Sequence, residues 1–287
     1  THVTIANNMA EYYDGGGMYL FVSNPTLTNM IISGNTANGD GGGMHLFSNS
    51  DPTLTNVTIA NNTAGLGGGM IINRFSHPTL TNITISNNTA IEYGGGMYIS
   101  DGSNPTLTNV TISGNTAGFG GGGMGVDGTN SSTLTNSIIW NNNPESIYLF
   151  SGNEEPMITY SDIEGGWEGE GNIDADPQFI DPENDDYNLQ EGSLCIDAGI
   201  TIDDMEYCGD APDMGAFEYI TEDCVECGAA LGDVNGDSQI NILDLVQIAN
   251  LIIEISTPYY ECAADYTGDG EVNILDLVQI ANYIIDN

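Results

Sequence analysis

The sequence predicts a mainly β protein, a right-handed parallel β-helix of about six to seven coils followed by a small α-helical domain. Three observations predict this class. A unit of 26 or 27 residues recurs through the first half of the chain. Within that unit the apolar residues lie two positions apart, as one face of a strand requires. Near the C-terminus a different unit, 21 residues long, occurs twice with a separation of 32 residues.

Each copy of the longer unit contains three short apolar segments. The copies begin at Pro25, Pro52, Pro78, Pro105, Ser132 and Pro156. In one coil the segments carry Leu27, then Met30 and Ile32, and then Met44 and Leu46. Segments this short cannot bury an apolar face alone, so we expect them to stack coil upon coil at a spacing of about 4.8 Å.

Asparagine and glycine mark the bends between these segments. Asn29 and its equivalents separate the first segment from the second, where asparagine tolerates a left-handed backbone and can bond its counterpart in the next coil. A second asparagine column, which includes Asn35 and Asn62, precedes the glycine runs. The glycines, at 41–43 for example, allow close backbone approach before the third segment. We assign residues 1–165 to the β-helix.

The repeat decays after residue 165, and residues 166–220 are expected to form a cap. Its apolar residues would cover the open end of the β-helix: Phe179, Ile180, Leu189, Ile196, Met214 and Phe217. Asp174, Asp176 and Asp181 form either a polar cap surface or a cation site. Residues 172–219 resemble the terminal segment, often called a choice-of-anchor domain, that follows β-helix repeats in secreted surface proteins. A linker at 221–228 leads to a last domain at 229–287.

Both copies of the shorter unit place oxygen-bearing residues at the spacing of a calcium-binding loop. Positions 1, 3, 5, 7, 9 and 12 are Asp233, Asn235, Asp237, Gln239, Asn241 and Asp244 in the first copy, and Asp265, Thr267, Asp269, Glu271, Asn273 and Asp276 in the second. A hard cation collects six or seven oxygens in this way, the residue at position 7 offering its backbone carbonyl. We therefore expect two calcium ions.

The paired loops, each followed by DLVQIAN and an apolar helix, resemble the dockerin modules of secreted bacterial proteins over roughly residues 229 to 287. Asp instead of Glu at position 12 points to this family. The resemblance implies a domain that folds around two calcium ions and binds a cohesin through the helix after each loop. It places Ile242, Leu243, Ile274 and Leu275 at the recognition positions. Because the two copies are identical there, docking in two orientations is implied.

Five cysteines lie after the repeats, at Cys195, Cys208, Cys224, Cys227 and Cys262. A zinc site is a poor explanation, because the three histidines lie in the distant repeats. An exported protein folds in an oxidising setting, so we expect disulfides. We pair Cys195 with Cys208, and Cys262 with either Cys224 or Cys227. The remaining thiol is either free or joins two chains.

The composition excludes several partners. The chain has 41 acidic residues and one cationic residue, which gives a formal charge of -40. Nucleic acids and anionic lipids are recognised by lysine and arginine, so neither is an expected partner. No apolar run is long enough to span a membrane, so we expect no membrane insertion. An extracellular or cell-surface location fits the dockerin resemblance.

Two hypotheses for function remain. The first is a structural or adhesive rod that is not an enzyme and has no catalytic residue, since Arg74 is the sole cation and the loop acids occur singly. Such a rod would join a cohesin-like partner, or other copies of the chain, into a filament. The alternative is a carbohydrate-binding or polysaccharide-degrading protein recruited to a cohesin-bearing complex. Its stacking face would consist of Tyr12, Tyr13, Tyr19, Phe47, Phe75, Tyr93, Tyr98 and Phe119.

Overall fold

The computed structural model describes residues 3–128, 131–150, 154–202, 207–220, 232–235, 239–253, 264, 266 and 272–286 of the chain. The chain divides into two compact units, Thr1–Tyr219 and Ile220–Asn287. Within the described residues, the strands belong to the first unit and the two α-helices to the second.

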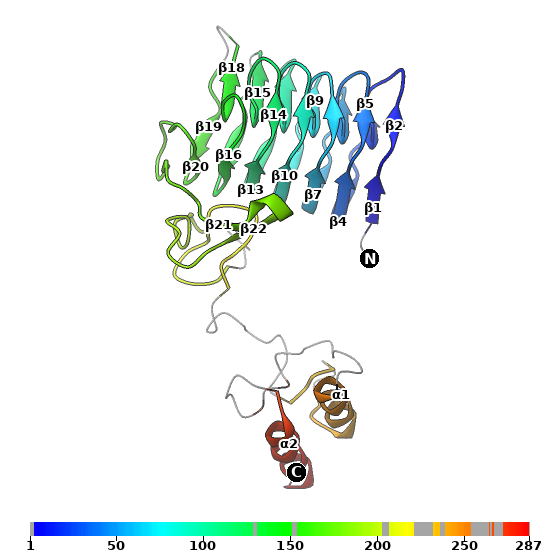
Figure 1. Ribbon diagram of the computed structural model, residues 1–287, viewed down its shortest axis with the longest axis vertical. Coiled ribbons are helices and arrows are strands. Elements are labelled where there is room, and N and C mark those ends of the chain that lie inside the picture. The colour runs from blue at the N-terminus through cyan, green and yellow to red at the C-terminus, as the bar shows by residue number, and fades with distance from the viewer. Residues whose placement is uncertain are drawn as a thin grey trace. The chain divides into compact units, whose positions relative to one another are not determined.

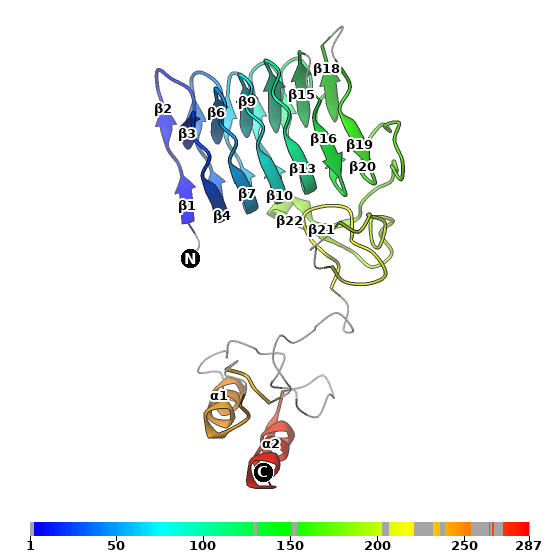
Figure 2. The ribbon, with the colours of Figure 1, turned by 180° about the vertical axis from the view of Figure 1, so that it is seen from behind.

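The first unit is a right-handed parallel β-helix of about six turns, so the predicted fold class is confirmed (Figures 1 and 2). The first sheet contains β1 (Val3–Ala6), β4 (Thr26–Ser33), β7 (Thr53–Ala60), β10 (Thr79–Ser86), β13 (Thr106–Ser113), β16 (Thr133–Thr135), β17 (Ile138–Trp140), β19 (Met157–Thr159) and β20 (Asp162–Ile163). The second contains β2 (Met9–Ala10), β5 (Thr36–Ala37), β8 (Thr63–Ala64), β11 (Thr89–Ala90) and β14 (Thr116–Ala117). The third contains β3 (Met18–Phe21), β6 (Met44–Phe47), β9 (Met70–Asn73), β12 (Met97–Ser100), β15 (Met124–Asp127) and β18 (Ile147–Leu149).

The apolar positions of the repeat form one continuous core inside the coils. Met70 pairs in register with Met44 on one side and Met97 on the other. Leu80 pairs in the same way with Leu54 and Leu107. All of these side chains are buried in a single cluster. Each coil therefore covers the apolar face of the next, as the spacing predicts.

Two details of the coil differ from the prediction. The first and second apolar segments of each inner coil form one eight-residue strand, because the pairing with the neighbouring strands continues on both sides of the asparagine between them. Asn56, one of these asparagines, has a φ of 54° and bends the strand. Its amide donates to Asn29 Oδ1 at 3.3 Å in the preceding coil, as expected for this column. The second sheet was not predicted at all. Its strands are two-residue pairs, mostly Thr–Ala, and two residues are too few to show a periodicity.

The second asparagine column satisfies buried backbone groups between coils. Asn62 Nδ2 donates to Ile32 O at 3.0 Å and to Asn88 Oδ1 at 3.0 Å, and Asn88 repeats the pattern with Ile59 and Asn115. Gly68 follows this column, and an added Cβ there would lie 2.5 Å from Gly95 O. Only glycine permits that approach of adjacent coils.

The cap packs on the outside of the first sheet and not over the end of the β-helix, which differs from the prediction. It contains the hairpin β21 (Phe179–Asp181) and β22 (Asp186–Leu189), joined by the 3-10 turn η1 (Pro182–Asn184). Its core includes the predicted Phe179, Leu189 and Met214, gathered around the outward side chain of Ile138. Figures 1 and 2 both place the hairpin beside the first sheet.

Two predicted cap residues, Ile180 and Phe217, are exposed, and Trp167 packs against the coil core in their place. Ile196 is partly buried against the cap core. Asp174, Asp176 and Asp181 each accept a local hydrogen bond, from Gly165, Gln178 and Asn184 respectively. In the part of the chain that the structure describes, no group of three or more acidic, histidine or cysteine residues could hold a metal.

The second unit contains α1 (Ile242–Ile252) and α2 (Ile274–Asp286). Its small core consists of Val234, Ile248, Ala264 and Ile280. Ile248 and Ile280 occupy the same position in the two copies of the repeat, so each copy supplies one central residue. Neither helix is long and apolar enough to cross a membrane.

Candidate functional site

Functional residues gather in two places, one in each unit. In the second unit they lie where the two repeated helices begin. In the first unit they lie on the outer face of the third sheet and in the loops that flank it. Each place is described by itself.

Both helices of the second unit begin with a capping arrangement between positions 9 and 12 of the predicted loop. Asn241 Oδ1 accepts from Leu243 N at 2.8 Å, and Asp244 Oδ2 accepts from Asn241 N at 2.9 Å. Asn273 Oδ1 accepts from Leu275 N and Asp276 Oδ2 from Asn273 N, both at 2.8 Å. These bonds satisfy backbone N–H groups that a helix leaves unpaired at its start.

The carboxylates of these caps are buried in a unit whose sequence contains no lysine, arginine or histidine. Asp244 and Asp276 are both 0% exposed, and Asp233 is 3% exposed. Asp244 Oδ1 also accepts from Asn235 N at 3.2 Å, which joins positions 3 and 12 of the first loop. Burying several negative charges in a unit of this composition is costly, so this donor set fits a bound divalent cation.

The predicted ligands are only partly described. The described residues include Asp233, Asn235, Gln239, Asn241, Asp244, Asn273 and Asp276. The other predicted ligands lie outside the described residues: Asp237, Asp265, Thr267, Asp269 and Glu271. Hydrogen bonds to Asp244 bring Asn235 and Asn241 of the first loop together. The assignment of these residues as calcium ligands stays a prediction.

Each helix exposes the same apolar residues on its first turns. Ile242 and Ile274 are each 62% exposed, and Leu243 and Leu275 are 58% and 57% exposed. Val246 and Val278, which the sequence reasoning missed, are both 51% exposed. Each valine follows the leucine by three residues and the isoleucine by four, and therefore lies on the same side of the helix. This spacing could have identified both valines from the sequence. We call each set of three an apolar patch.

The cysteines do not form the predicted pair. Cys195 is a free and fully buried thiol in the cap core. Its Sγ donates to Asp162 Oδ2 at 3.2 Å, which gives the thiol a partner other than cysteine. Cys208 is disulfide-bonded. Cys224, Cys227 and Cys262 lie outside the described residues.

Aromatic side chains form two clusters on the outer face of the third sheet and in the loops that flank it. In the first, Tyr19 stacks on Phe47 at 6.2 Å between ring centroids, and Phe21 stacks on Phe47 at 6.0 Å. In the second, Tyr93 contacts Phe119, Tyr148 and Phe150 at 5.5, 5.4 and 4.7 Å. Tyr98 lies at 6.2 Å from Phe150 but is almost buried.

The sequence reasoning predicted Tyr19, Phe47, Tyr93, Tyr98 and Phe119 for this face. It missed Phe21, Tyr148 and Phe150, although Phe21 follows Tyr19 by two residues, the spacing of one strand face. Tyr12 and Tyr13 are exposed in the loop before β3.

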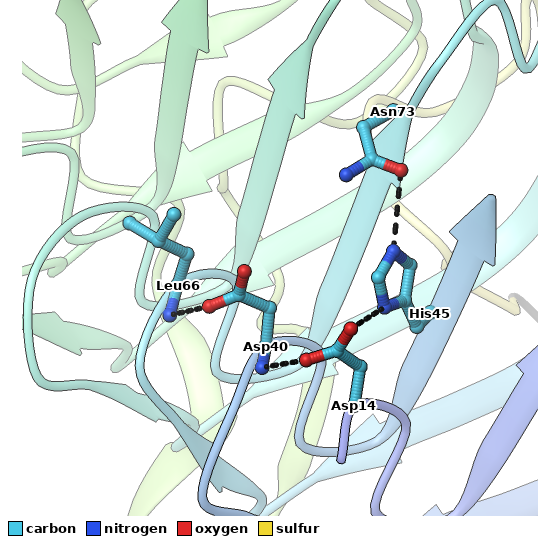
Figure 3. Close-up of polar contacts among 5 residues, drawn as sticks. All are labelled: Asp14, Asp40, His45, Leu66 and Asn73. Carbon is cyan, nitrogen blue, oxygen red and sulfur yellow. Dashed lines mark hydrogen bonds and ion pairs between the residues drawn. The ribbon is translucent and has the colours of Figure 1, made fainter. Parts of the chain in front are cut away.

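A ladder of carboxylates joins the loops beside this face to the sheet (Figure 3). Asp14 Oδ1 accepts from Asp40 N at 2.9 Å, and Asp40 Oδ1 accepts from Leu66 N at 3.0 Å. Asp14 Oδ2 also lies 3.5 Å from His45 Nδ1, and His45 Nε2 lies 3.2 Å from Asn73 Oδ1. Burial raises the pKa of Asp40 and lowers the pKa of His45.

His45 is buried between these loops and the first aromatic cluster. Its side chain is 2% exposed, so nothing in solution reaches it. The ring also contacts Tyr19 and Phe47 edge-on at 5.0 and 5.5 Å. It therefore connects the acidic loops to the first aromatic cluster.

Two family models match the chain. The right handed beta helix region matches residues 1–119 and 67–170, which is more than half of the sequence, so the chain belongs to this family. The dockerin type I domain matches residues 231–285, and the C-terminal unit is a dockerin domain. Dockerin domains bind calcium and cohesin partners, and they occur in secreted cellulosome components. No curated protein sequence matches the chain significantly.

One solved structure with a similar fold is the crystal structure of pectate lyase Pel9A. It aligns with 72% of this chain and 69% of its own length, at 15% identity and a TM-score of 0.45. The match to the β-helix family, whose fold is typical of polysaccharide-degrading enzymes, contradicts the prediction that the chain is not an enzyme. That prediction depended on the shortage of cationic side chains, and this shortage does not exclude catalysis.

Proposed function

We propose that this chain is a secreted, polysaccharide-directed β-helix protein that its dockerin domain attaches to a cohesin-bearing complex. One observation carries the docking part of this proposal: the two apolar patches of the second unit. The aromatic outer face of the third sheet supports the polysaccharide part. The hypothesis of a filament-forming rod has no comparable support and stays a prediction.

The apolar patches suit a partner surface because they are exposed, equal and repeated. A soluble protein gains nothing from leaving Ile242, Leu243 and Val246 in water on adjacent turns, and contiguous exposed apolar residues mark interaction sites. The second copy offers the same three residue types at nearly the same exposure. A cohesin could therefore bind either helix, in two orientations related by the internal repeat.

Calcium would be held by the oxygens of both loops, two ions in all. In the first loop Asp233, Asn235 and Asp244 would contribute, and in the second Asp276 would contribute. Bound calcium supplies positive charge to a unit that has no cationic residue in its sequence. Because Asn241 and Asp244 also cap α1, ion binding and the position of the first apolar patch are linked.

The outer face of the third sheet suits a long carbohydrate chain. Sugar rings present an apolar side that stacks on aromatic rings and an edge of hydroxyl groups that bonds to polar side chains. The first aromatic cluster lies on β3 and β6, and the second lies on and just after β18 and in the loops before β12 and β15. The acidic loops that contain Asp14 and Asp40 lie beside the same sheet. The face therefore offers both kinds of contact along the axis of the β-helix.

The docking proposal is tested by calorimetry of the full chain with a purified cohesin domain and calcium. Replacing Ile242 and Leu243 by Ser, or Ile274 and Leu275 by Ser, should weaken binding by no more than a few fold. Replacing all four should weaken it by a factor on the order of 100, about 2.7 kcal/mol. Ile253→Ser is the matched control, since Ile253 is also 62% exposed but lies after α1. Unchanged binding by the fourfold variant would contradict the proposal.

The polysaccharide proposal is tested by affinity electrophoresis through gels that contain single polysaccharides, neutral or acidic, together with an assay for new chain ends. We expect retardation in at least one gel. Retardation should be lost when Phe47 and Tyr93, one aromatic from each cluster, are both replaced by Ala. Free migration of the intact protein in every gel would end this part of the proposal.

A further inference from the structure

One cavity lies at the edge of the third sheet, where β9, β12 and β15 end. It has a volume of about 490 Å³ and is lined by Arg74, Phe75, Asp101, Gly102, Asp127 and Gly128. We call it the Arg74 cavity. Its size falls within the range of about 300 to 1,000 Å³ that is typical of small-molecule sites. It contains the single cationic side chain of the 287-residue sequence.

The backbone at this cavity has two consecutive non-glycine residues with positive φ angles. Arg74 and Phe75 have φ angles of 57° and 60°, in the left-handed region. The preceding coil has Ser48 and Asn49 at this bend, and the following coil has Asp101 and Gly102, residue types that mostly suit such a backbone. A bulky Phe is unfavourable there, and strain of this kind clusters at functional sites.

Stability does not explain why Arg74 and Phe75 occupy the bend. Arg74 Nε lies 3.5 Å from Asp101 Oδ2, but both side chains are more than half exposed, and such surface pairs contribute little. Phe75 is 60% exposed, so its ring is only partly packed. The ring edge lies against Gly102, where an added Cβ would be 2.9 Å from Phe75 Cε1. Glycine at 102 therefore leaves room for the ring at the cavity wall.

The polar groups of the cavity contact neighbouring residues. The Arg74 guanidinium lies over the Phe47 ring at 5.5 Å from its centroid, and so joins the cavity to the first aromatic cluster. Tyr98 donates its hydroxyl hydrogen to Asp127 Oδ2 at 3.1 Å. Burial raises the pKa of Tyr98, so this hydroxyl stays a donor. Donors on Arg74, acceptors on Asp101 and Asp127, and the ring of Phe75 thus surround one space.

We propose that the Arg74 cavity is a subsite for one ring of a neutral sugar chain, with Phe75 as the stacking platform. The proposal rests on the polysaccharide-directed function above and specifies where a ring is held and which class of sugar is bound. One cation and two carboxylates line the cavity, so its net charge is -1, and the cation is already paired. A uronate would be repelled by Asp127, whereas the hydroxyl groups of a neutral sugar can donate to both carboxylates.

The test is calorimetry of the full chain, with calcium, against neutral trisaccharides cut from β-glucan, xylan and mannan, and against trigalacturonate. We expect a neutral trisaccharide to bind. Phe75→Ala should weaken this binding about tenfold, the loss of roughly one stacking contact. Asp127→Asn should also weaken binding, whereas Phe75→Tyr, which keeps an aromatic ring, should retain it. Leu194→Ala is the matched control, since Leu194 is 66% exposed in the cap but lies outside the cavity and both aromatic clusters, and it should change binding less than about twofold.

The outcomes separate this inference from the proposed function. Tighter binding of trigalacturonate than of any neutral trisaccharide would overturn the neutral class. Equal binding by Phe75→Ala and the unchanged protein would overturn the location. In both cases retardation in polysaccharide gels would leave the proposed function standing. Absence of both retardation and trisaccharide binding would overturn both. Circular dichroism of each variant confirms that the β-helix is intact.

Discussion

The β-helix and the dockerin domain are both built by repetition, yet repetition serves opposite purposes in them. In the β-helix the repeated apolar residues, such as Met44 and Met70, are 0% exposed because each coil packs on the next. In the dockerin domain the repeated Ile242 and Ile274 are 62% exposed. There the repeated residues that are buried completely include carboxylates, Asp244 and Asp276.

The difference teaches what must complete each structure. An inner coil of the stack needs no other partner, because it buries its apolar face against its own copies on both sides. Beside its small apolar core, to which Ile248 and Ile280 belong, the dockerin repeat also buries charge and exposes apolar surface, which a self-sufficient core would not do. We expect a cation inside and a protein partner outside to complete it. The first two of the following predictions compare the two units, and the others concern buried groups of the first unit.

The largest expected effect is that of calcium removal. A chelator should unfold the dockerin domain and leave the β-helix folded, because we expect the dockerin loops to gather buried carboxylates around an ion. In the described residues of the coils, no group of three or more acidic, histidine or cysteine residues could hold a metal. At calcium levels about 1,000 times the dissociation constant, binding stabilises the folded state by about 4 kcal/mol. Far-ultraviolet circular dichroism should show loss of helix signal with the strand signal retained, and thermal unfolding should lose one transition. Equal helix content with and without chelator would contradict the comparison.

The second effect is that of removing a repeated apolar side chain from each unit. Leu80→Ala should lower the free energy of unfolding of the β-helix by about 2 to 5 kcal/mol, because Leu80 is fully buried between Leu54 and Leu107. Ile242→Ala should change dockerin stability by less than about 0.5 kcal/mol. Thermal unfolding with calcium present measures both. Similar losses would mean that the apolar patch is part of a core.

A smaller effect concerns a buried carboxyl group of the first unit. Burial raises the pKa of Asp162 to about 6, from an ordinary value of 3.8. Its folded state therefore holds a proton more tightly than its unfolded state, and stability falls as pH rises between these two values. Above about pH 6 the whole penalty is present.

Asp162→Asn should remove this part of the pH dependence. Urea unfolding of both proteins at about pH 5 and about pH 7.5 should show that the parent loses more stability than the variant on going to the higher pH. Glu218, whose pKa burial raises to about 7, is present in both proteins and cancels in the difference. A variant with the same pH slope as the parent would remove Asp162 as the cause.

The smallest effect is chemical. Cys195 is buried, and burial raises the pKa of its thiol, so iodoacetamide should not label it in the folded protein. Labelling should appear once denaturant opens the cap, and peptide mapping identifies the site. Rapid labelling of the native protein would show that the cap opens more readily than its buried core implies.

The sequence predicted the elements whose signal is repeated and failed where the signal is local. The three apolar columns and the bend at Asn29 could be predicted, because stacking forces equivalent residues of every coil into one environment. The two-residue strands of the second sheet could not, since two residues carry no period. The cap was assigned to the wrong surface, because its apolar residues show that it packs but not that Ile138 is its partner. The pairing of Cys195 failed for the same reason.

The functional sites divide in the same way. The spacing of oxygen-bearing residues around Asp233 and Asp265 predicted calcium loops, since the ligands of such a loop lie close together along the sequence. The Arg74 cavity could not be predicted, because Phe75, Asp101 and Asp127 belong to different coils and meet only when these stack. The sequence by itself determined the period, the inward face and the acidic loops, which depend on local spacing. Only the tertiary structure decided which surface the cap covers and which loops share a cavity, because those contacts join residues that are far apart along the chain.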